Sequence, residues 1–514
     1  MTIIDWLVIA AYLMGMIGIG IYFAMQNRSR EDYLLGGRSM KATAVGLSLF
    51  ASLFSANSYL AFPADTALYG PIAGSMILSY PIVFVIVGYG LIPQFMRLRI
   101  TSAYEILELR FGTGLRMLGA LMFLLLRLLW MGTIIYATAD KVLVPLLNLD
   151  KSATPYFCVG ITVLTIVYTA MGGLRAVVIS DAIQSVLLLA GALLTVVVAM
   201  VAIGGPEEML QAEATEHWAR FDWTFDISVR ATVPIVLVSQ LVWWVCTCGS
   251  DQMAVQRYLA TRDARTARKM LGISLVSSAA TIATLVLVGM ALGAYYREFP
   301  SELAPHTLAS TDWTNVAFPK FITHGLPTGI TGAIIAGLLA AAMSSLSSGF
   351  NSSSLVIAVD FLDRIGNKTT SAMQSPLRAQ ALTVIVGILT ILVSLAVAKL
   401  GKGHNLFDLV INNSNVLVTP LFLLFFMAMF VPWATRLGVW CGVLAATYLA
   451  VSLGFFNNFG FGGLWQQSHP MTFWMMPVSL LVGAAVGCLV SLLPWSQRCP
   501  SLELAAPEEL DGSE

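Results

Sequence analysis

The sequence predicts an all-α polytopic membrane protein, from its composition, its long apolar segments and the distribution of its basic residues. Of the 514 residues, 57% are hydrophobic and only 11% are charged, whereas soluble domains carry about 25% charged residues. The mean hydropathy is +0.80. So little polar surface cannot cover a water-facing globule of this size, and we therefore expect lipid around most of it. The zero net charge gives no reason to expect a nucleic-acid partner.

Thirteen segments are apolar enough to cross the hydrocarbon, which takes about 20 residues of helix. We expect helices because an unpaired strand would leave its amides unsatisfied in lipid. The predicted spans are residues 5–25, 43–68, 74–96, 117–146, 155–171, 181–203, 231–253, 271–294, 329–359, 380–400, 406–430, 437–456 and 472–494.

The basic residues predict the orientation of these spans. With the N-terminus outside, the inside segments hold 19 of the 28 basic residues and the outside segments hold eight. The positive-inside rule therefore favours an outside N-terminus and a cytoplasmic C-terminus. Arg127 remains inside a predicted span, where it either snorkels to the interface or pairs with an acid.

Two clusters of polar residues inside the predicted spans favour an ion site. In the first, serines lie around Ser55–Ser58 ahead of Pro63, and a helix break there would free carbonyls to bind a cation. Serines that bond back to the previous turn of an intact helix are an equal alternative. In the second, seven serines fall within residues 344–354, and hydroxyls are hard ligands that suit Na⁺. Close helix packing is the alternative for this second cluster.

Two further clusters favour a solute cavity. Gln240, Trp244 and Thr247 lie in the span 231–253, where the tryptophan forms either an interfacial belt or a cavity wall. Three asparagines between residues 412 and 415 are expected to bond a polar solute or another helix. The basic run after Gln256 is expected to be an inside loop. Asp181, at the start of its predicted span, fits the helix dipole.

The chain offers little for other chemistries. Its six cysteines and five histidines form no metal-type spacing. We see no nucleophile–base pair and no clustered acids, so we expect neither an enzyme nor an organic cofactor.

Six motifs in a fixed order connect the chain to a known family. They are DYLLGGRSM (32–40), ASLFSANSYLAFPADTALYG (51–70), ITSAYEILELRFG (100–112), AMGGLRAVVISDAIQ (170–184), SDQMAVQRYLATRDARTAR (250–268) and AAAMSSLSSGFNS (340–352). Together they resemble the sodium/solute symporter family, which includes sodium–glucose, sodium–proline, monocarboxylate, iodide and multivitamin cotransporters.

The resemblance implies a fold with two inverted five-helix repeats of the LeuT type, each beginning with a broken helix. The implied organisation is residues 1–42 for the first helix and a cytoplasmic loop, 43–203 and 231–430 for the repeats, 204–230 and 295–328 for outer loops, 431–494 for two C-terminal helices and 495–514 for a disordered cytoplasmic tail.

The resemblance also implies the ligand sets. The main sodium site would use the carbonyls of Ala51, Phe54 and Ala341 and the hydroxyls of Ser344 and Ser345. A second sodium, found in some members, would use Asp181, Ser344, Ser347 and Ser348. The solute candidates are Ser55, Ser58, Gln240, Trp244, Thr247 and Asn412. Sugar-transporting members tend to carry Asn and Gln where this chain has Leu53 and Ser58, which disfavours a glucose-type pocket. The motif that runs from ASLFSA to FPAD is closer to the monocarboxylate, iodide and vitamin branch.

The predicted function is sodium-driven uptake of a small polar solute by alternating access, in a multi-pass inner or plasma membrane protein. The protein would be a monomer or a weak homo-oligomer. A proton-coupled carrier on the same fold is the first alternative, although only Asp181 could titrate at the serine-rich site. A transporter-like sensor is the second, and the short segment after residue 494 disfavours it.

Overall fold

The regular elements of the computed structural model are helices in the residues that it describes, which are 1–26, 29–98, 100–147, 149–207, 209, 222–226, 231–300, 313–363, 376–400, 415–456, 472–493 and 499. This part of the chain holds ten helices long and apolar enough to cross a membrane, or eleven if one bent pair counts as a single span. Thirteen spans therefore stay a prediction. Parts of both predicted outer loops, and all of the predicted tail except Cys499, lie outside the described residues.

Most predicted spans coincide with one helix each. The main elements are α1 (Ile3–Ala24), η2 (Pro71–Ser79), α5 (Tyr80–Val85), η3 (Ile86–Leu91), α6 (Ile92–Arg97), α8 (Thr113–Ala137), α14 (Ala264–Glu298), α17 (Ile330–Val356), η7 (Ile357–Leu362), α19 (Pro376–Leu400), α21 (Val418–Phe430), α22 (Arg436–Phe456) and α23 (Thr472–Ser491).

The predicted span 43–68 is interrupted. It consists of α3 (Ala42–Leu53) and α4 (Ala56–Tyr69), whose axes differ by 62°. Phe54 and Ser55 between them have extended backbone, with φ −103° and −100°. The Ser58 amide donates to the Ser55 hydroxyl at 3.4 Å, which caps α4. The predicted break is confirmed, but Pro63 lies inside α4 and does not end the helix at Phe62.

A second interruption lies between α12 (Val233–Ser250) and α13 (Gln252–Leu259). Asp251 between them has φ −85° and ψ 122°, and its side chain accepts a hydrogen bond from the Met253 amide at 2.8 Å. Each of the two predicted repeats thus begins with a broken helix. Such breaks expose carbonyls at one helix end and amides at the other inside the membrane.

One helix differs from the expected layout. The 50-residue α10 (Thr154–Ile203) covers both predicted spans 155–171 and 181–203. The direction changes at Gly173, whose φ of 62° and ψ of −160° are not helical. A Cβ at Gly173 would lie 2.7 Å from the Tyr33 carbonyl oxygen, so the turn also depends on close backbone approach. Asp181 therefore lies two turns beyond the break instead of at a helix start.

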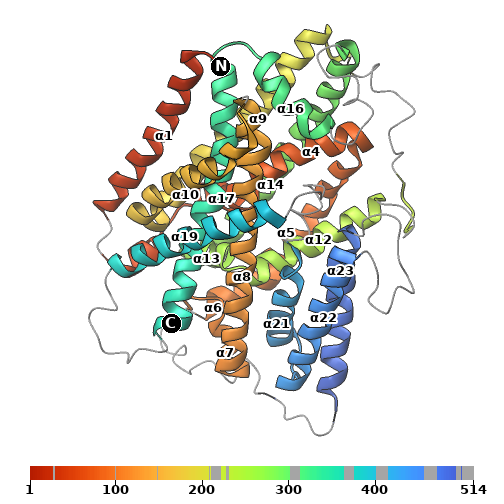
Figure 1. Ribbon diagram of the computed structural model, residues 1–514. Helices are drawn as coiled ribbons and strands as arrows, with labels where there is room; N and C mark the ends of the chain where they lie inside the picture. The colour runs from red at the N-terminus through yellow and green to blue at the C-terminus, as the bar shows by residue number, and fades with distance from the viewer. Residues whose placement is uncertain are drawn as a thin grey trace.

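The core of the molecule is α17, which packs against α10, α3 and α8 (Figure 1). Of the residues in its most apolar stretch, 89% are buried inside the protein, against 17% for α1 at the periphery. Asp5 of α1 accepts hydrogen bonds from the amides of Gly329 and Gly332 at 2.8 and 2.9 Å. This carboxylate therefore caps the start of α17.

The helices α22 and α23 lie side by side at one edge of the molecule (Figure 1). Glycines four residues apart face each other across this pair, at 438 and 442 in α22 and at 483 and 487 in α23. A Cβ at Gly442 would lie 2.7 Å from the Gly483 carbonyl oxygen. This is the small-residue packing by which membrane helices approach closely.

We predict that Gly173→Ala destabilises the protein by about 1–3 kcal/mol, because this φ and ψ are open almost only to glycine. The check is the thermal unfolding midpoint of the purified protein in detergent. Gly160→Ala in the same helix is the control, because an added Cβ there meets nothing within 4 Å. An equal effect of the two substitutions would contradict this account of the turn.

Candidate functional site

Four helices bring buried polar side chains together near the middle of the molecule. These side chains, all of which are buried, are Ser48 and Ser52 of α3, Asp181 of α10, Arg257 of α13 and the serines of α17. Polar groups inside a membrane protein are costly unless they bond one another. Their convergence from helices of both halves of the chain marks this cluster as the candidate functional site.

The end of α3 meets the serines of α17. The Ser344 hydroxyl lies 3.0 Å from the Ala51 carbonyl oxygen and 3.1 Å from that of Ala341. The Ser345 hydroxyl lies 3.4 Å from the Ser52 carbonyl oxygen. The structure thus joins Ala51, Ala341 and Ser344 directly, as the sodium hypothesis requires. Carbonyls lack helical partners here because α3 ends at Leu53.

Phe54 is less directly placed. It lies at the break itself, and its amide donates to the Phe50 carbonyl at 2.9 Å. No hydrogen bond joins its carbonyl to α17 among the described residues. Its role as a ligand stays a prediction that depends on its position one turn beyond Ala51.

Asp181 lies at the centre of the second group. Its Oδ2 accepts hydrogen bonds from Ser48 at 2.6 Å and from Ser348 at 3.0 Å. Its Oδ1 accepts a longer one from Ser347 at 3.4 Å. All of the residues proposed for a second sodium therefore lie in this group, since Ser347 also donates to the Ser344 carbonyl at 3.0 Å.

Arg257 is the residue that the sequence interpretation misplaced. It was expected in an inside loop, but it belongs to α13, is 1% exposed and forms an ion pair with Asp181 at 3.0 Å. The same nitrogen lies 2.5 Å from the Ser52 hydroxyl and 2.6 Å from that of Ser348. A fixed positive charge therefore stands beside the oxygens proposed for the second sodium.

No local pattern pointed to this pair, because 76 residues separate Arg257 from Asp181. The available signal was a lone acid in an otherwise apolar segment. Such an acid requires a cation or a proton as its partner. The basic run after Gln256, which begins with Arg257, was a candidate source of that cation.

The solute candidates lie on two elements. Ser55 and Ser58 lie at the start of α4, whereas Gln240, Trp244 and Thr247 lie within α12. The Trp244 ring packs edge-on against Tyr80 of α5 at 5.7 Å between centroids, and the buried Thr247 hydroxyl has no hydrogen-bond partner among the described residues. No hydrogen bond in this part of the chain joins the two serines to α12. Asn412 lies outside the described residues.

Next to these, the Trp243 indole of α12 donates to the Asn415 side chain at 3.1 Å. Asn415 belongs to the predicted asparagine cluster and lies three residues before the start of α21. Of the two expectations for that cluster, a bond to another helix is thus confirmed for Asn415.

Arg127 pairs with an acid, which settles its predicted role. Its guanidinium forms an ion pair with Asp251 at the break between α12 and α13. It also lies over the Trp130 ring, 4.6 Å from the centroid. The second broken helix is therefore attached to α8 by a buried charge pair, as the first is attached to α17 by serines.

Comparison with known proteins now identifies the family. The sequence profile of the sodium:solute symporter family matches residues 33–446. The chain belongs to this family. Its members are transporters, and the chain is accordingly a sodium-coupled symporter and a multi-pass plasma membrane protein.

Relatives and solved structures agree over nearly the whole chain. The sodium/sialic acid symporter SiaT of Proteus mirabilis is 30% identical over 481 residues, covering 90% of this chain and 92% of that protein. Mouse sodium-coupled monocarboxylate transporter 1 is also 30% identical, over 88% of this chain and 73% of that protein.

A solved Na⁺-coupled sialic acid symporter superposes with a TM-score of 0.82 at 26% identity, covering 97% of this chain and 99% of that chain. Mhp1, a nucleobase-cation-symport-1 transporter, has a TM-score of 0.56 at 11% identity over 90% of this chain and 93% of its own. These likenesses establish the symporter fold.

We predict that Asp181→Asn destabilises the protein by about 3–5 kcal/mol, because it leaves Arg257 buried without its counter-charge. The double variant Asp181→Asn/Arg257→Gln should be more stable than this single variant, since both charges are removed together. Thermal unfolding in detergent measures both, with Asp150→Asn at an exposed position as the control. Strictly additive losses in the double variant would contradict a direct pair.

Proposed function

We propose that this symporter imports a small carboxylate, with sialic acid as the first candidate, by alternating access. Two bacterial sodium/sialic acid symporters are 30% identical to the chain over 90% of its length. The monocarboxylate transporter, at the same identity, also has a carboxylate substrate. A carboxylate is therefore the chemistry that these relatives share.

The observation that carries the sodium part is the contact of Ser344 with the Ala51 and Ala341 carbonyls. Three oxygens already lie within hydrogen-bond distance, and Ser345 approaches the next carbonyl of α3 at 3.4 Å. A sodium ion bound here would replace hydroxyl protons as the partner of those oxygens. It would tie α3 to α17, and its release would allow them to separate.

The start of α4 supports binding of an anionic group. The helix begins at the break, next to Ser55, which is 5% exposed, and the helix dipole places partial positive charge there. Half-helix N-termini of this kind hold substrate carboxylates in transporters with broken helices. The remaining candidates, Gln240, Trp244, Thr247 and Asn412, would then contact the rest of the solute from α12 and the segment before α21.

A second sodium remains part of the proposal, with one constraint from the structure. Arg257 faces Oδ2 of Asp181, so a second ion would bind on the Oδ1 side, with Ser347 and Ser344. The stoichiometry then decides the electrical character of transport. One sodium with one carboxylate moves no net charge, whereas two move one positive charge, worth about 2.3 kcal/mol per 100 mV.

The proposed repeats cover residues 43–203 and 231–430, with the N-terminus outside and the C-terminus cytoplasmic.

Among the described residues, the charge pair Arg116–Asp360, at 2.7 Å, joins α8 to η7 directly after α17. The Ser102 hydroxyl donates to the same carboxylate at 2.6 Å. We propose that these bonds close the cytoplasmic side and break when α17 moves. The oligomeric proposal is a monomer or a weak homo-oligomer.

We predict that Ser344→Ala raises the sodium concentration for half-maximal uptake by roughly 10- to 100-fold, the effect of losing one ligand to a charged group. Ser345→Ala should likewise weaken sodium activation more than it alters solute selectivity. Ser353→Ala in the same helix is the control, because its hydroxyl is buried without a partner among the described residues. Unchanged sodium activation in both test variants would exclude this site.

We predict sodium-dependent uptake of sialic acid, or failing that of a short monocarboxylate, in proteoliposomes with an inward sodium gradient. Neutral sugars of similar size should be poor substrates, because the α4 amides would have no anion to bind. Replacing sodium with choline should abolish uptake. Faster uptake of a neutral sugar would exclude the carboxylate proposal, and dependence on an imposed potential would separate two sodium ions from one.

A further inference from the structure

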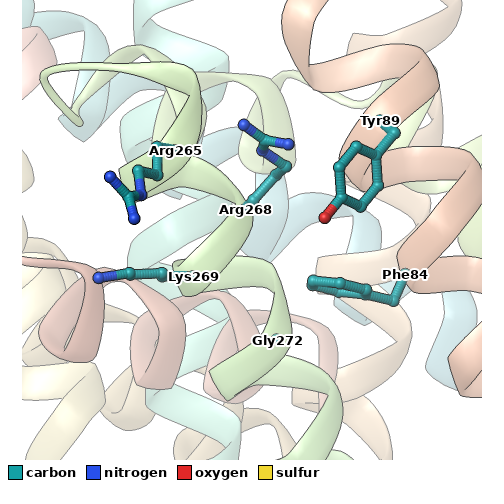
Figure 2. A pocket seen from close by; sticks show the side chains of 6 residues that line it. All are labelled: Phe84, Tyr89, Arg265, Arg268, Lys269 and Gly272. Atoms are coloured by element: carbon teal, nitrogen blue, oxygen red, sulfur yellow. The ribbon is translucent and has the colours of Figure 1, made fainter.

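A basic pocket of about 270 Å³ lies away from the serine and Asp181 site. Phe84 of α5, Tyr89 of η3 and four residues of α14 line it: Arg265, Arg268, Lys269 and Gly272. Figure 2 shows Arg268 projecting toward Tyr89, whereas the side chains of Arg265 and Lys269 project to the other side of the same helix. The Arg268 guanidinium lies 4.6 Å from the Tyr89 ring centroid.

The charge of this pocket is uncompensated among the residues that line it. Three cations fall within five positions of α14, where i,i+3 and i,i+4 neighbours of like charge repel each other. They also lie in the first two turns of the helix, where the dipole favours anions instead. The acid next in sequence, Asp263, is engaged, because it accepts from the Thr266 amide at 2.7 Å and pairs with Arg262 at 3.0 Å.

The surface beside the pocket is apolar and open to lipid. Ile82 and Val85 of α5 are 49% and 59% exposed, and Val276, two turns after Arg268, is 70% exposed. In a membrane protein, side chains exposed in this way contact acyl chains. Cationic and apolar surfaces therefore adjoin as the headgroup and the tails of a phospholipid do.

The geometry points to a binding site for the phosphodiester headgroup of an anionic phospholipid from the cytoplasmic leaflet. Arg268 binds the phosphate beside Tyr89, which covers the headgroup, and the acyl chains follow Val85 and Val276. Arg265 and Lys269 add positive potential from the same end of α14. Basic pockets between helices at the cytoplasmic end of a membrane protein recognise such headgroups. The pocket volume of about 270 Å³ is smaller than that of most drug-sized ligand sites, which fits a headgroup and not a whole lipid.

Occupation of this site would act on the helix that supports the sodium region. The α14 backbone packs directly on α3, since a Cβ at Gly46 would lie 2.7 Å from the Met270 carbonyl oxygen. Met270 directly follows Lys269. A lipid bound across α5 and α14 therefore fixes α14 against α5 one residue away from its contact with α3.

The test uses the full chain in a neutral detergent, titrated with phosphatidylglycerol or with phosphatidylcholine, and measures thermal unfolding. Phosphatidylglycerol should raise the unfolding midpoint of the unmodified protein and phosphatidylcholine should not. Arg265→Gln/Arg268→Gln/Lys269→Gln should weaken the apparent affinity by up to about 100-fold, from the contribution of each cation near an anionic surface. Arg97→Gln/Arg378→Gln/Arg436→Gln, which removes three exposed cations elsewhere, should keep the effect.

Three results would overturn the site. The first is an equal loss of phosphatidylglycerol affinity in the two triple variants. The second is a rise in the unfolding midpoint of the pocket variant with phosphatidylglycerol that is as large as that of the unmodified protein. The third is a rise for the unmodified protein with inorganic phosphate or glycerol phosphate, at the same ionic strength, that equals the rise with phosphatidylglycerol. The last would assign the pocket to a free anion. If the pocket variant does not fold, Arg265→Lys/Arg268→Lys, which keeps the charge, and Arg268→Gln alone replace it. Native mass spectrometry of the unmodified protein then shows whether phosphatidylglycerol is retained over phosphatidylcholine.

Discussion

The ion pair between Asp181 and Arg257 is the constraint on which the centre of this protein depends. Neither charge is stable alone in a dry interior, because removal from water costs several kcal/mol for each ion. The pair is bonded by Ser48 and Ser52 of α3 and by Ser348 of α17. Four helices from both halves of the chain are thereby held in one register, although the pair need not add net stability.

The two broken helices gain their chemistry from this arrangement. The end of α3 presents carbonyls to the serines of α17, and the start of α4 presents amides on the other side of Ser55. One short break therefore offers opposite partial charges to a cation and to an anion. Ser344 donates to the Ala51 carbonyl of α3 while its own carbonyl accepts from Ser347, the partner of Asp181. Movement of α17 would therefore affect the proposed sodium site and the charge pair together.

Hydropathy and residue type predicted the helical fold, the break beside Ser55 and the contact of Ser344 with Ala51, because each follows from short-range patterns or from the family motifs. They did not predict the burial of Arg257, since a basic run near a span end is usually solvated. The break between the predicted spans 155–171 and 181–203 is present at Gly173, but the patterns placed Asp181 at a helix start instead of two turns beyond that break. Long-range pairing is what the sequence pattern lacks.

Several of the basic residues that produce the positive-inside bias have structural partners of their own. Arg116 and Arg257 are among the 19 basic residues counted in the inside segments, yet both are buried and each neutralises a membrane acid, Asp360 and Asp181. Arg265, Arg268 and Lys269 also belong to that count, and they lie where lipid headgroups are expected. One charge asymmetry would therefore serve the proposed orientation, the proposed closure of the cytoplasmic side and the proposed attachment to lipid. Because these roles use different residues, substitutions that preserve the net bias can still separate them.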